Sequence, residues 1–585
     1  MLFVFAALFL VTGARAFWLQ AVDGPQLAAM ANRQHTQTVT IPAGRGTVYD
    51  RNGVELAIGE QATTVYADPT QVKDPQGVAL AAKAILGVDP NAIYKALLNK
   101  NTHFAYIARQ ADPLKAARLR KKALPGIFFY GEEHRAYPQG AVAANVLGFA
   151  GIDNHGLAGL EHSLDASLVG HPGSQTVIKA PDGTTLDVES ATPERQGQSV
   201  VLAIDHTIQA EAEAVLRDSM KQWHAKAASA VVLDPITGEV LAMASAPGFN
   251  ANNYAKADPE SQRNRAVTDT YEPGSTFKLV TVTAALSEQL VTPLTRFNLP
   301  YSIDVADRTV HDAELRGTET LTVRQILARS SNVGAITLAQ KLGKARLAAW
   351  IERFGFGKTT GIDFPGESAG IVLATKNWSG STIGNVPIGQ GIAVTPIQMA
   401  SVYATIANGG ERIVPRLVQS VDGKATPLVK TRVIPAALAR ELTGMLTNVV
   451  VTGTGMEAAI PGFNVAGKTG TAEKPDPRGG YAKGKYVASF VGFVPASKPR
   501  FVVLVLVDEP QGSIFGGVIA APAFQRIARF ALQYYEVPPD APNTLVAPGG
   551  APARAAATTA PATAAAVSPA LTGVTSGTAG LTPLG

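Results

Sequence analysis

Short apolar segments stand on both sides of a long, mainly helical stretch, and this arrangement constrains the fold more than any other feature. The predicted strands cover residues 229–233, 240–243, 486–493 and 501–507. The first two are joined by a turn containing Pro235 and Gly238, which predicts a hairpin. The helices predicted between the two pairs cover residues 277–286, 323–327 and 397–406. Strands, then helices, then strands predict one α+β domain over residues 225–536, whose sheet closes from both ends of the segment.

The region before this domain, residues 36–224, is predicted to be a separate and more irregular mixed unit. Asp50–Gly53 has turn composition between short apolar runs. Asp205 has the chemistry of a helix N-cap, and a helix is predicted over residues 207–222.

Residues 1–22 carry one charge, Arg15, and the first eleven residues are wholly apolar. A membrane-spanning helix needs about 20 apolar residues, and Phe17-Trp18 suits a membrane interface. We therefore predict a retained membrane anchor that places the rest of the chain outside the cytoplasm. A cleaved signal peptide and a buried core helix are the alternatives. A signal peptide should begin with basic residues, and their absence leaves open a start upstream of Met1.

Residues 541–585 contain one charged residue, Arg554, and are dominated by Ala, Thr, Pro and Gly without a hydrophobic period. Such a segment cannot bury enough apolar surface to offset its ordering entropy. We predict a disordered C-terminal tail.

Composition excludes several classes of site. The chain has 585 residues and no cysteine, so disulfides, thiolate metal sites and cysteine nucleophiles are excluded. The net charge of +5 is too small over this length to indicate a nucleic acid partner. The nine histidines show no metal-ligand spacing, and we expect neither a metal nor a cofactor.

One motif is misleading. Gly462–Thr469 fits the nucleotide-binding pattern G-x-x-x-x-G-K-[ST]. A phosphate-binding loop must lead into a helix, whose first backbone N–H groups hold the phosphate. Pro475 and Pro477, followed by two glycines, exclude that helix. We therefore reject a nucleotide site.

The first element of a nucleophilic site is the S-x-x-K pair Ser275 and Lys278. Pro273 and Gly274 precede a predicted helix, so Ser275 lies at its start and Lys278 lies on the same face three residues later. Serine is a weak nucleophile until a base removes its proton. A lysine can be that base when burial and nearby cations lower its pKa. By itself, the pair also fits a serine at a helix start beside a solvated lysine.

Two further elements follow in the same domain. Ser330-Ser331-Asn332 by itself fits an ordinary polar turn, and Lys468-Thr469-Gly470-Thr471 fits a strand edge. The order, spacing and shared domain of the three elements favour a functional interpretation.

These motifs resemble those of the penicillin-binding protein and serine β-lactamase superfamily. The wider resemblance, over about residues 20–536, is to class B penicillin-binding proteins, the monofunctional peptidoglycan transpeptidases. Its other segments are Arg45-Gly46, Asp50–Gly53, Arg135–Pro138, Gly156–Glu161, Ile204–Gln209, Gly389–Gly391 and Thr395–Gln398. The resemblance implies a transpeptidase domain with an antiparallel sheet and helices, preceded by an elongated mixed domain, here called the pedestal.

The resemblance also implies a mechanism. Ser275 would attack the D-Ala-D-Ala carbonyl of a peptidoglycan stem peptide and form an acyl-enzyme, with Lys278 as its base. The other implied roles are proton relay for Ser330, substrate and lysine positioning for Asn332, electrostatic support for Lys468, and substrate binding for Thr469, Gly470 and Thr471. The backbone N–H groups of Ser275 and Thr471 would form the oxyanion hole.

The implied partners are stem peptides, lipid II-derived glycan strands, β-lactams, the membrane, and division proteins that include a SEDS-type glycosyltransferase. No Glu-Asp-x-x-Phe motif of a glycan polymerase is present, so the glycan must come from another protein. The layout of the chain is most similar to the septal, division-specific branch. The alternatives are an elongation-type transpeptidase, a β-lactamase, a β-lactam sensor and a non-catalytic division scaffold.

Overall fold

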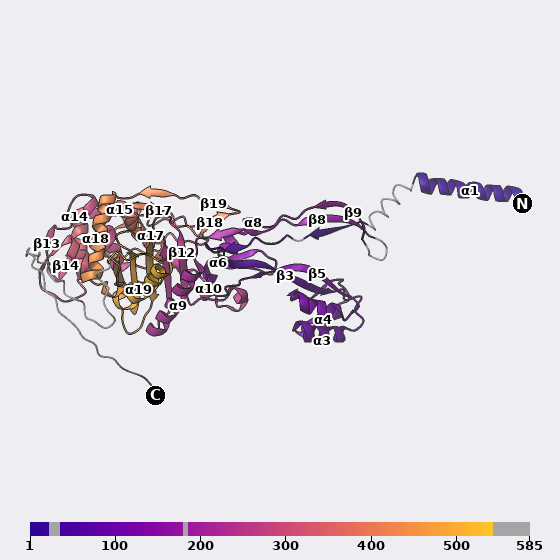
Figure 1. Cartoon of the computed structure of the whole chain (residues 1–585), viewed down its shortest axis with the longest axis horizontal. Coiled ribbons are helices and arrows are strands. Elements are labelled where there is room, and N and C mark those ends of the chain that lie inside the picture. Colours follow the sequence, from indigo (N-terminus) through magenta and orange to yellow (C-terminus); the bar gives the residue numbers. More distant parts are fainter. Residues whose placement is uncertain (23–35, 42, 180–184, 542–585) are drawn as a thin grey trace, which may run out of the picture.

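The molecule is elongated, and the computed structural model describes residues 1–22, 36–41, 43–179 and 185–541. Figure 1 shows a large domain at one end, two slimmer extensions beside it, and helix α1 (Leu2–Ala21) at the other end. The predicted C-terminal tail, from residue 542 on, lies outside the described residues.

Helix α1 is 20 residues long and apolar enough to cross a membrane. At 1.5 Å per residue it spans about 30 Å, the thickness of a bilayer core. All of its residues are exposed, which contradicts the alternative of a buried core helix. A retained anchor and a signal sequence both fit this geometry.

The N-terminal region is built from short elements. Its strands are β1 (Thr36–Ile41), β2 (Val48–Tyr49), β3 (Glu55–Ala67), β4 (Ala105–Ala111), β5 (Ile127–Ala136), β6 (Phe149–Ala150), β7 (Gly156–Ala158), β8 (Gly173–Lys179), β9 (Thr185–Thr192) and β10 (Val200–Leu202). Its helices are α3 (Pro75–Leu86), α4 (Pro90–Leu98), α5 (Pro113–Arg120), α6 (Ala144–Leu147), α7 (Gly159–Ser163) and α8 (Asp165–Leu168). Strands β1, β8 and β9 form an antiparallel arm. Strands β3–β5 and helices α3–α5 form a lobe, here called the head (Figure 1).

The N-terminal sheet continues into the large domain. Its strand order is β19-β18-β10-β2-β3-β4, with β5 paired to β3. Strands β18 (Val418–Val421) and β19 (Lys424–Ala425) come from within the predicted 225–536 segment, and Val200 of β10 pairs with Val421. The two regions therefore share a sheet, which sequence periodicity did not reveal.

A buried network of charges stabilises the N-terminal region. The Arg45 guanidinium donates to Glu161 Oε2 (2.7 Å) and Asp165 Oδ1 (2.6 Å), and Arg135 Nε donates to Glu161 Oε1 (2.7 Å). Arg45, Arg135 and Glu161 are all buried. Three segments named in the sequence analysis, those of Arg45, Arg135 and Glu161, thus meet in one cluster. Arg45 lies at its centre, in the interior of the pedestal.

The large domain has a five-stranded antiparallel sheet in the order β12-β11-β23-β22-β21. Strands β11 (Ala227–Leu233) and β12 (Val240–Ala246) form the predicted hairpin. Strands β21 (Ala466–Pro475), β22 (Tyr481–Val494) and β23 (Phe501–Asp508) join it from the other end of the segment. The prediction of a sheet that closes from both ends is confirmed.

Helices cover both faces of this sheet. Helices α9 (His206–Trp223) and α19 (Gly516–Tyr534) pack on one face, where Leu216 and Phe524 contact the strands through one apolar core. The other core contains α12 (Lys278–Ser287), α13 (Val323–Ala328), α14 (Asn332–Leu342), α15 (Lys344–Arg353), α17 (Pro396–Ala407) and α18 (Ala436–Thr452). Asp205 caps α9 as predicted, accepting hydrogen bonds from Thr207 N and Ile208 N.

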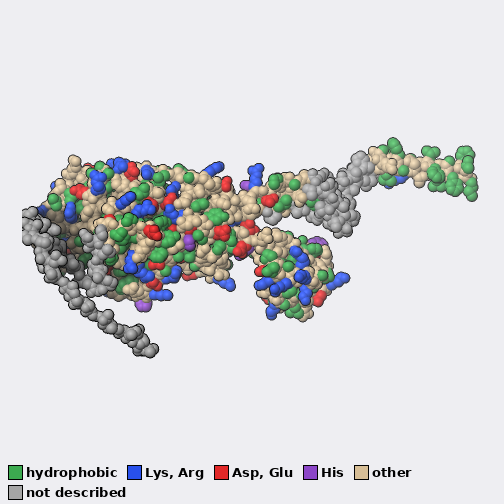
Figure 2. Space-filling model, in the orientation of Figure 1, with side chains coloured by type: hydrophobic (Ala, Val, Ile, Leu, Met, Phe, Trp, Pro, Cys, Tyr) green, Lys and Arg blue, Asp and Glu red, His purple; other side chains and the backbone are tan. Residues whose placement is uncertain are grey.

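The remaining elements of the large domain are short. Its helical turns are η1 (Ala251–Lys256), α10 (Pro259–Gln262), α11 (Arg265–Thr268), η2 (Gly274–Phe277), η3 (Thr375–Asn377), α16 (Thr382–Asn385), η4 (Val386–Ile388) and η5 (Met456–Ala458). Its short strands are β13 (Arg296–Leu299), β14 (Ser302–Val305), β15 (Arg308–His311), β16 (Glu319–Thr322), β17 (Glu411–Ile413) and β20 (Lys430–Arg432). On the face shown in Figure 2, basic and acidic side chains are interspersed over this domain, in keeping with the small net charge of the whole chain.

Candidate active site

Ser275 lies in the 3₁₀ turn η2, directly before helix α12, which starts at Lys278. The turn packs tightly against strand β21. A Cβ on Gly274 would lie 2.6 Å from Thr471 O, and a Cβ on Gly470 would lie 3.0 Å from Pro273 O. Tyr403 of α17 donates a hydrogen bond to Thr276 O (3.0 Å) from the other side. These contacts fix Ser275 against the strand that carries the third motif.

Lys278 is buried and joins the first motif to the second. Its Nζ donates to Ser330 O, to Ser330 Oγ (3.2 Å) and to Asn332 Oδ1 (2.7 Å). No hydrogen bond joins it to Ser275 Oγ among the described residues, and such contacts often form only when substrate binds. Burial lowers the Lys278 pKa to about 7, although the nearby Asp312 carboxylate opposes this shift. A large fraction of this lysine is therefore neutral near pH 7 and able to accept a proton.

The second motif forms a constrained turn between α13 and α14. Ser330 has a φ of +59°, a left-handed conformation that is uncommon for residues other than glycine. Ser331 caps α14, accepting a hydrogen bond from Gly334 N (3.0 Å). This conformation directs Ser330 Oγ and Asn332 Oδ1 toward Lys278.

Asp312 is a buried residue beside the site that no sequence motif indicated. Its buried carboxylate accepts hydrogen bonds from Ser331 Oγ (2.9 Å) and from the backbone N–H groups of Asn332 (2.5 Å) and Val333 (3.0 Å). Arg316 pairs with the same carboxylate at 2.5 Å. Asp312 follows strand β15 and has no motif around it, so only the fold brings it to this turn.

We expect Asp312→Asn to slow acylation about 10- to 100-fold, because hydrogen bonds to a charged group contribute about 1.5–3 kcal/mol. The Asp312 charge raises the Lys278 pKa. Its removal should therefore also move the acid limb of the acylation pH profile to lower pH. The exposed Asp307→Asn is the matched control. A slower reaction with an unshifted pH profile would reduce Asp312 to a structural role.

The third motif lies on β21, the edge strand of the sheet. Lys468 is fully buried, and its Nζ donates to Thr469 Oγ1 (3.1 Å) and Thr454 Oγ1 (3.4 Å). Burial, followed by the charge of Lys278, lowers the Lys468 pKa well below its usual value. Thr471 Oγ1 accepts a hydrogen bond from Gly516 N (3.2 Å). The strand continues past Lys468 to Pro475, so the helix that a nucleotide site needs is absent from this segment.

Glu272, three residues before Ser275, is a second buried carboxylate near the site that no sequence motif indicated. It accepts hydrogen bonds from Gly391 N (2.8 Å) and Tyr481 Oη (3.0 Å), and burial raises its pKa.

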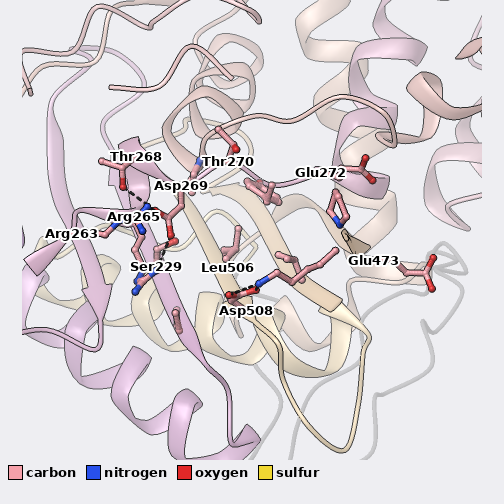
Figure 3. A pocket seen from close by; sticks show the side chains of 17 residues that line it. Ser229, Arg263, Arg265, Thr268, Asp269, Thr270, Glu272, Glu473, Leu506 and Asp508 are labelled. Atoms are coloured by element: carbon pink, nitrogen blue, oxygen red, sulfur yellow. Dashed lines mark hydrogen bonds and ion pairs between the residues drawn. The ribbon is translucent and has the colours of Figure 1, made fainter. Parts of the chain in front are cut away.

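Glu272 also lines a cavity of about 330 Å³ beside the Ser275 turn (Figure 3). Two ion pairs, Arg265–Asp269 and Lys474–Asp508, lie in this cavity. The lining contains no residue of the three motifs, so the cavity is separate from the predicted nucleophile.

The structure thus brings all three motifs together. Ser275, Ser330, Asn332 and Thr471 are partly exposed, whereas Lys278 and Lys468 are buried behind them. Such an arrangement can activate a hydroxyl and bind an anionic group.

Within the described part of the chain, one cluster outside this site has metal-ligand chemistry. Asp50, Asp205 and His206 have ligand atoms within 4.8 Å of one another. Asp50 Oδ2 already contacts His206 Nδ1 (2.7 Å), and Asp205 Oδ2 accepts from Asn52 (3.1 Å) and Tyr535 Oη (2.9 Å). We interpret the cluster as a structural junction. It joins the Asp50–Gly53 turn of the pedestal, the start of α9 and the C-terminal end of the large domain.

Two protein families match the chain in successive segments. Residues 40–202 match the penicillin-binding protein dimerisation domain, and residues 228–529 match the penicillin binding protein transpeptidase domain.

Curated relatives and solved structures match over nearly the same range. The peptidoglycan D,D-transpeptidase FtsI of Escherichia coli is 35% identical over 539 residues, covering 91% of this chain and 90% of the relative. PbpB of Mycobacterium tuberculosis is 36% identical over 574 residues, covering 92% and 84%. A crystal structure of penicillin binding protein 3 from Mycobacterium tuberculosis, complexed with aztreonam, has a TM-score of 0.68 and 32% identity, and the match covers 87% of this chain and 100% of that chain.

Proposed function

Since the chain belongs to the class B penicillin-binding proteins and is a peptidoglycan transpeptidase, we propose that Ser275 is the residue acylated by the stem peptide. The observation that carries this proposal is the position of Lys278. It lies one turn after Ser275, is buried with a pKa of about 7, and contacts Ser330 and Asn332 of the second motif.

In the first half of the reaction, Lys278 accepts the Ser275 hydroxyl proton while Oγ bonds to the carbonyl carbon of the penultimate D-Ala. The C–N bond to the terminal D-Ala then breaks. Ser330 Oγ, 3.2 Å from Lys278 Nζ, relays the proton to the leaving nitrogen. An ester between Ser275 and the donor peptide remains.

In the second half, an amine of a neighbouring stem peptide attacks the ester carbonyl and loses a proton to the same base. The new C–N bond is the crosslink, and Ser275 Oγ leaves and is reprotonated. Backbone N–H groups of Ser275 and Thr471 stabilise the oxyanion in both halves, with each donor contributing about 100- to 1000-fold in rate.

The third motif binds the substrate carboxylate. Thr469 and Thr471 supply hydroxyl groups, Gly470 allows the Ser275 turn to approach, and Lys468 adds positive potential. Asn332 positions Lys278 and the substrate backbone.

A two-step assay tests this function. Labelled penicillin should acylate the protein, and a donor stem peptide with an acceptor amine should then give the crosslinked product. Acylation followed only by hydrolysis would indicate a β-lactamase, acylation without turnover of peptide a sensor, and no acylation a scaffold.

We further propose that the enzyme acts in septal wall synthesis, with the large domain outside the cytoplasm. The 35% identity to FtsI, over 90% of that relative, supports the septal branch, and helix α1 supports membrane attachment. The labelled protein should concentrate at the division site. An even distribution along the lateral wall would favour the elongation-type alternative.

A third proposal concerns the pedestal, which we infer docks a SEDS-type glycosyltransferase and couples glycan polymerisation to crosslinking. Arg45 supports it as the centre of the buried network that shapes this region. We expect full-length Arg45→Ala to copurify less with the polymerase and to stimulate it less, while penicillin acylation persists. Undiminished copurification and stimulation by a variant with a measurably loosened pedestal would overturn the coupling role.

A further inference from the structure

Aromatic side chains gather on the outer face of the head sheet. They come from all three strands and the residue before β4, and four of them are 38–46% exposed. The members are Tyr66, Phe104, Tyr106, Phe128 and Tyr130, here called the aromatic face. A contiguous cluster of exposed apolar side chains rimmed by polar groups is typical of an interaction site.

The strand register builds this face. Tyr66 of β3 lies opposite Phe128 of β5 and opposite Tyr106 of β4. The Tyr66 ring is 4.9 Å from the Phe104 ring and 5.4 Å from the Phe128 ring, and both pairs are stacked. Because strands carry the rings and the rings support one another, they are held in place before any partner arrives.

The opposite face of the same sheet already supplies the hydrophobic core of the head. Val65, Ala67 and Ile107 alternate with the aromatic positions and pack against helices α3–α5. The folding of the head therefore does not require a second apolar face. A sheet with one solvated face normally carries polar residues there, so these five rings need another explanation.

The charges beside the aromatic face limit the chemical class of partner that it can bind. Beside these rings, Arg109 stacks over Tyr106 at 5.3 Å, and its charge is paired with the carboxylates of Glu132 and Asp153. The basic side chains of α5, such as Lys115 and Arg118, belong to a helix on the other side of the sheet. The five rings are themselves uncharged and include three phenol groups, and the adjacent Arg109 is already paired with carboxylates, so the face suits a neutral, hydroxyl-rich partner. An anionic lipid surface would require unpaired Lys or Arg.

We propose that the aromatic face binds the glycan strand of peptidoglycan, and this rests on the proposed function. The flat face of a sugar ring presents C–H bonds that pack against the negative face of an aromatic ring. Tyrosine hydroxyls can then hydrogen-bond to the sugar hydroxyl and acetamido groups. The head lies between the large domain and the α1 end (Figure 1). A strand held there is kept near the enzyme between successive crosslinks.

The test measures binding of neutral β-1,4-linked N-acetylglucosamine oligomers to the full-length protein, with the active site first acylated by penicillin, because a peptide-free peptidoglycan strand would carry a lactyl carboxylate on every second sugar. We expect Phe128→Ser with Tyr130→Ser to weaken binding about tenfold or more, because two stacking partners are lost. Tyr94→Ser is the matched control, because this 42% exposed tyrosine lies on α4, on the other side of the sheet. Binding should be similar in 0.15 and 1 M salt, because the proposed contacts join uncharged rings to uncharged sugars.

Equal binding by the double variant, no binding by the wild type, or loss of binding in 1 M salt would each overturn the proposal. Loss of copurification with a division protein or of binding to vesicles, with glycan binding unchanged, would assign the face to a protein or lipid partner instead. Penicillin acylation should be the same in all variants, so a failure here is distinguishable from a failure of the catalytic assignment.

Discussion

Replacing Lys278 by methionine is expected to slow acylation by penicillin about 10²- to 10⁴-fold, the usual contribution of a positioned general base. Methionine is apolar and of similar length, so it suits a buried site. Only the proton-accepting nitrogen and its three hydrogen bonds are lost. The measurement is the second-order acylation rate, with thermal unfolding followed in parallel. The exposed Lys341→Met on α14 is the matched control.

The pH profile provides a second readout of the same prediction. The neutral amine is the base, and the Lys278 pKa is lowered to about 7. Wild-type acylation should therefore rise as pH increases through about 7 and level off above it. The Lys278→Met variant should lose this acid limb. A variant that acylates at the normal rate, or that keeps the same limb, would show that another group is the base.

The largest loss of stability is expected from Glu161→Gln. Glu161 is the hydrogen-bond partner of Arg135 within the described part of the chain, and it also pairs with Arg45. The substitution leaves two buried guanidinium groups without this carboxylate. Breaking a buried ion pair by removing one partner costs about 3–5 kcal/mol.

Denaturant unfolding, with limited proteolysis to locate the unfolded region, measures this effect. The pedestal should become susceptible to protease first, while Ser275 can still be acylated under native conditions. The exposed Glu60→Gln controls for the loss of a carboxylate on the same region. Unchanged stability of Glu161→Gln would mean that the two arginines find other partners, and the network would not be what shapes the pedestal.

The sequence patterns predicted the large domain well because its signals are local. The hairpin of β11 and β12 has a Pro/Gly turn, and α9 has an Asp205 cap, so each can be identified from a short window. The closing of the sheet by β22 and β23 followed from their composition and position, whereas β21 was not among the strands predicted in this way. The shared sheet was missed because β18 and β19 are four and two residues long, and β18 pairs with β10, which is far away in the chain.

The distinction between local signals and contacts of distant segments applies to the site as well. Ser275, Ser330 and Lys468 lie in short motifs with fixed spacing, and the fold brings them together as expected. Asp312 and Glu272 have no such spacing. Their place beside the site depends on which backbone N–H groups the fold brings to their carboxylates, at Asn332 for Asp312 and at Gly391 for Glu272. The aromatic face was missed because Tyr66, Tyr106 and Phe128 lie on separate strands, and only the register unites them.

The identity of the acylated residue tests the central claim most directly. The full-length protein would be treated with penicillin, digested and analysed by mass spectrometry, with Ser275→Ala as the control. We predict a single adduct on the peptide that contains Ser275, and none in the variant. An adduct on Ser330 or Ser331, or continued acylation of Ser275→Ala, would contradict the assignment of the nucleophile and with it the proposed roles of Lys278 and Lys468.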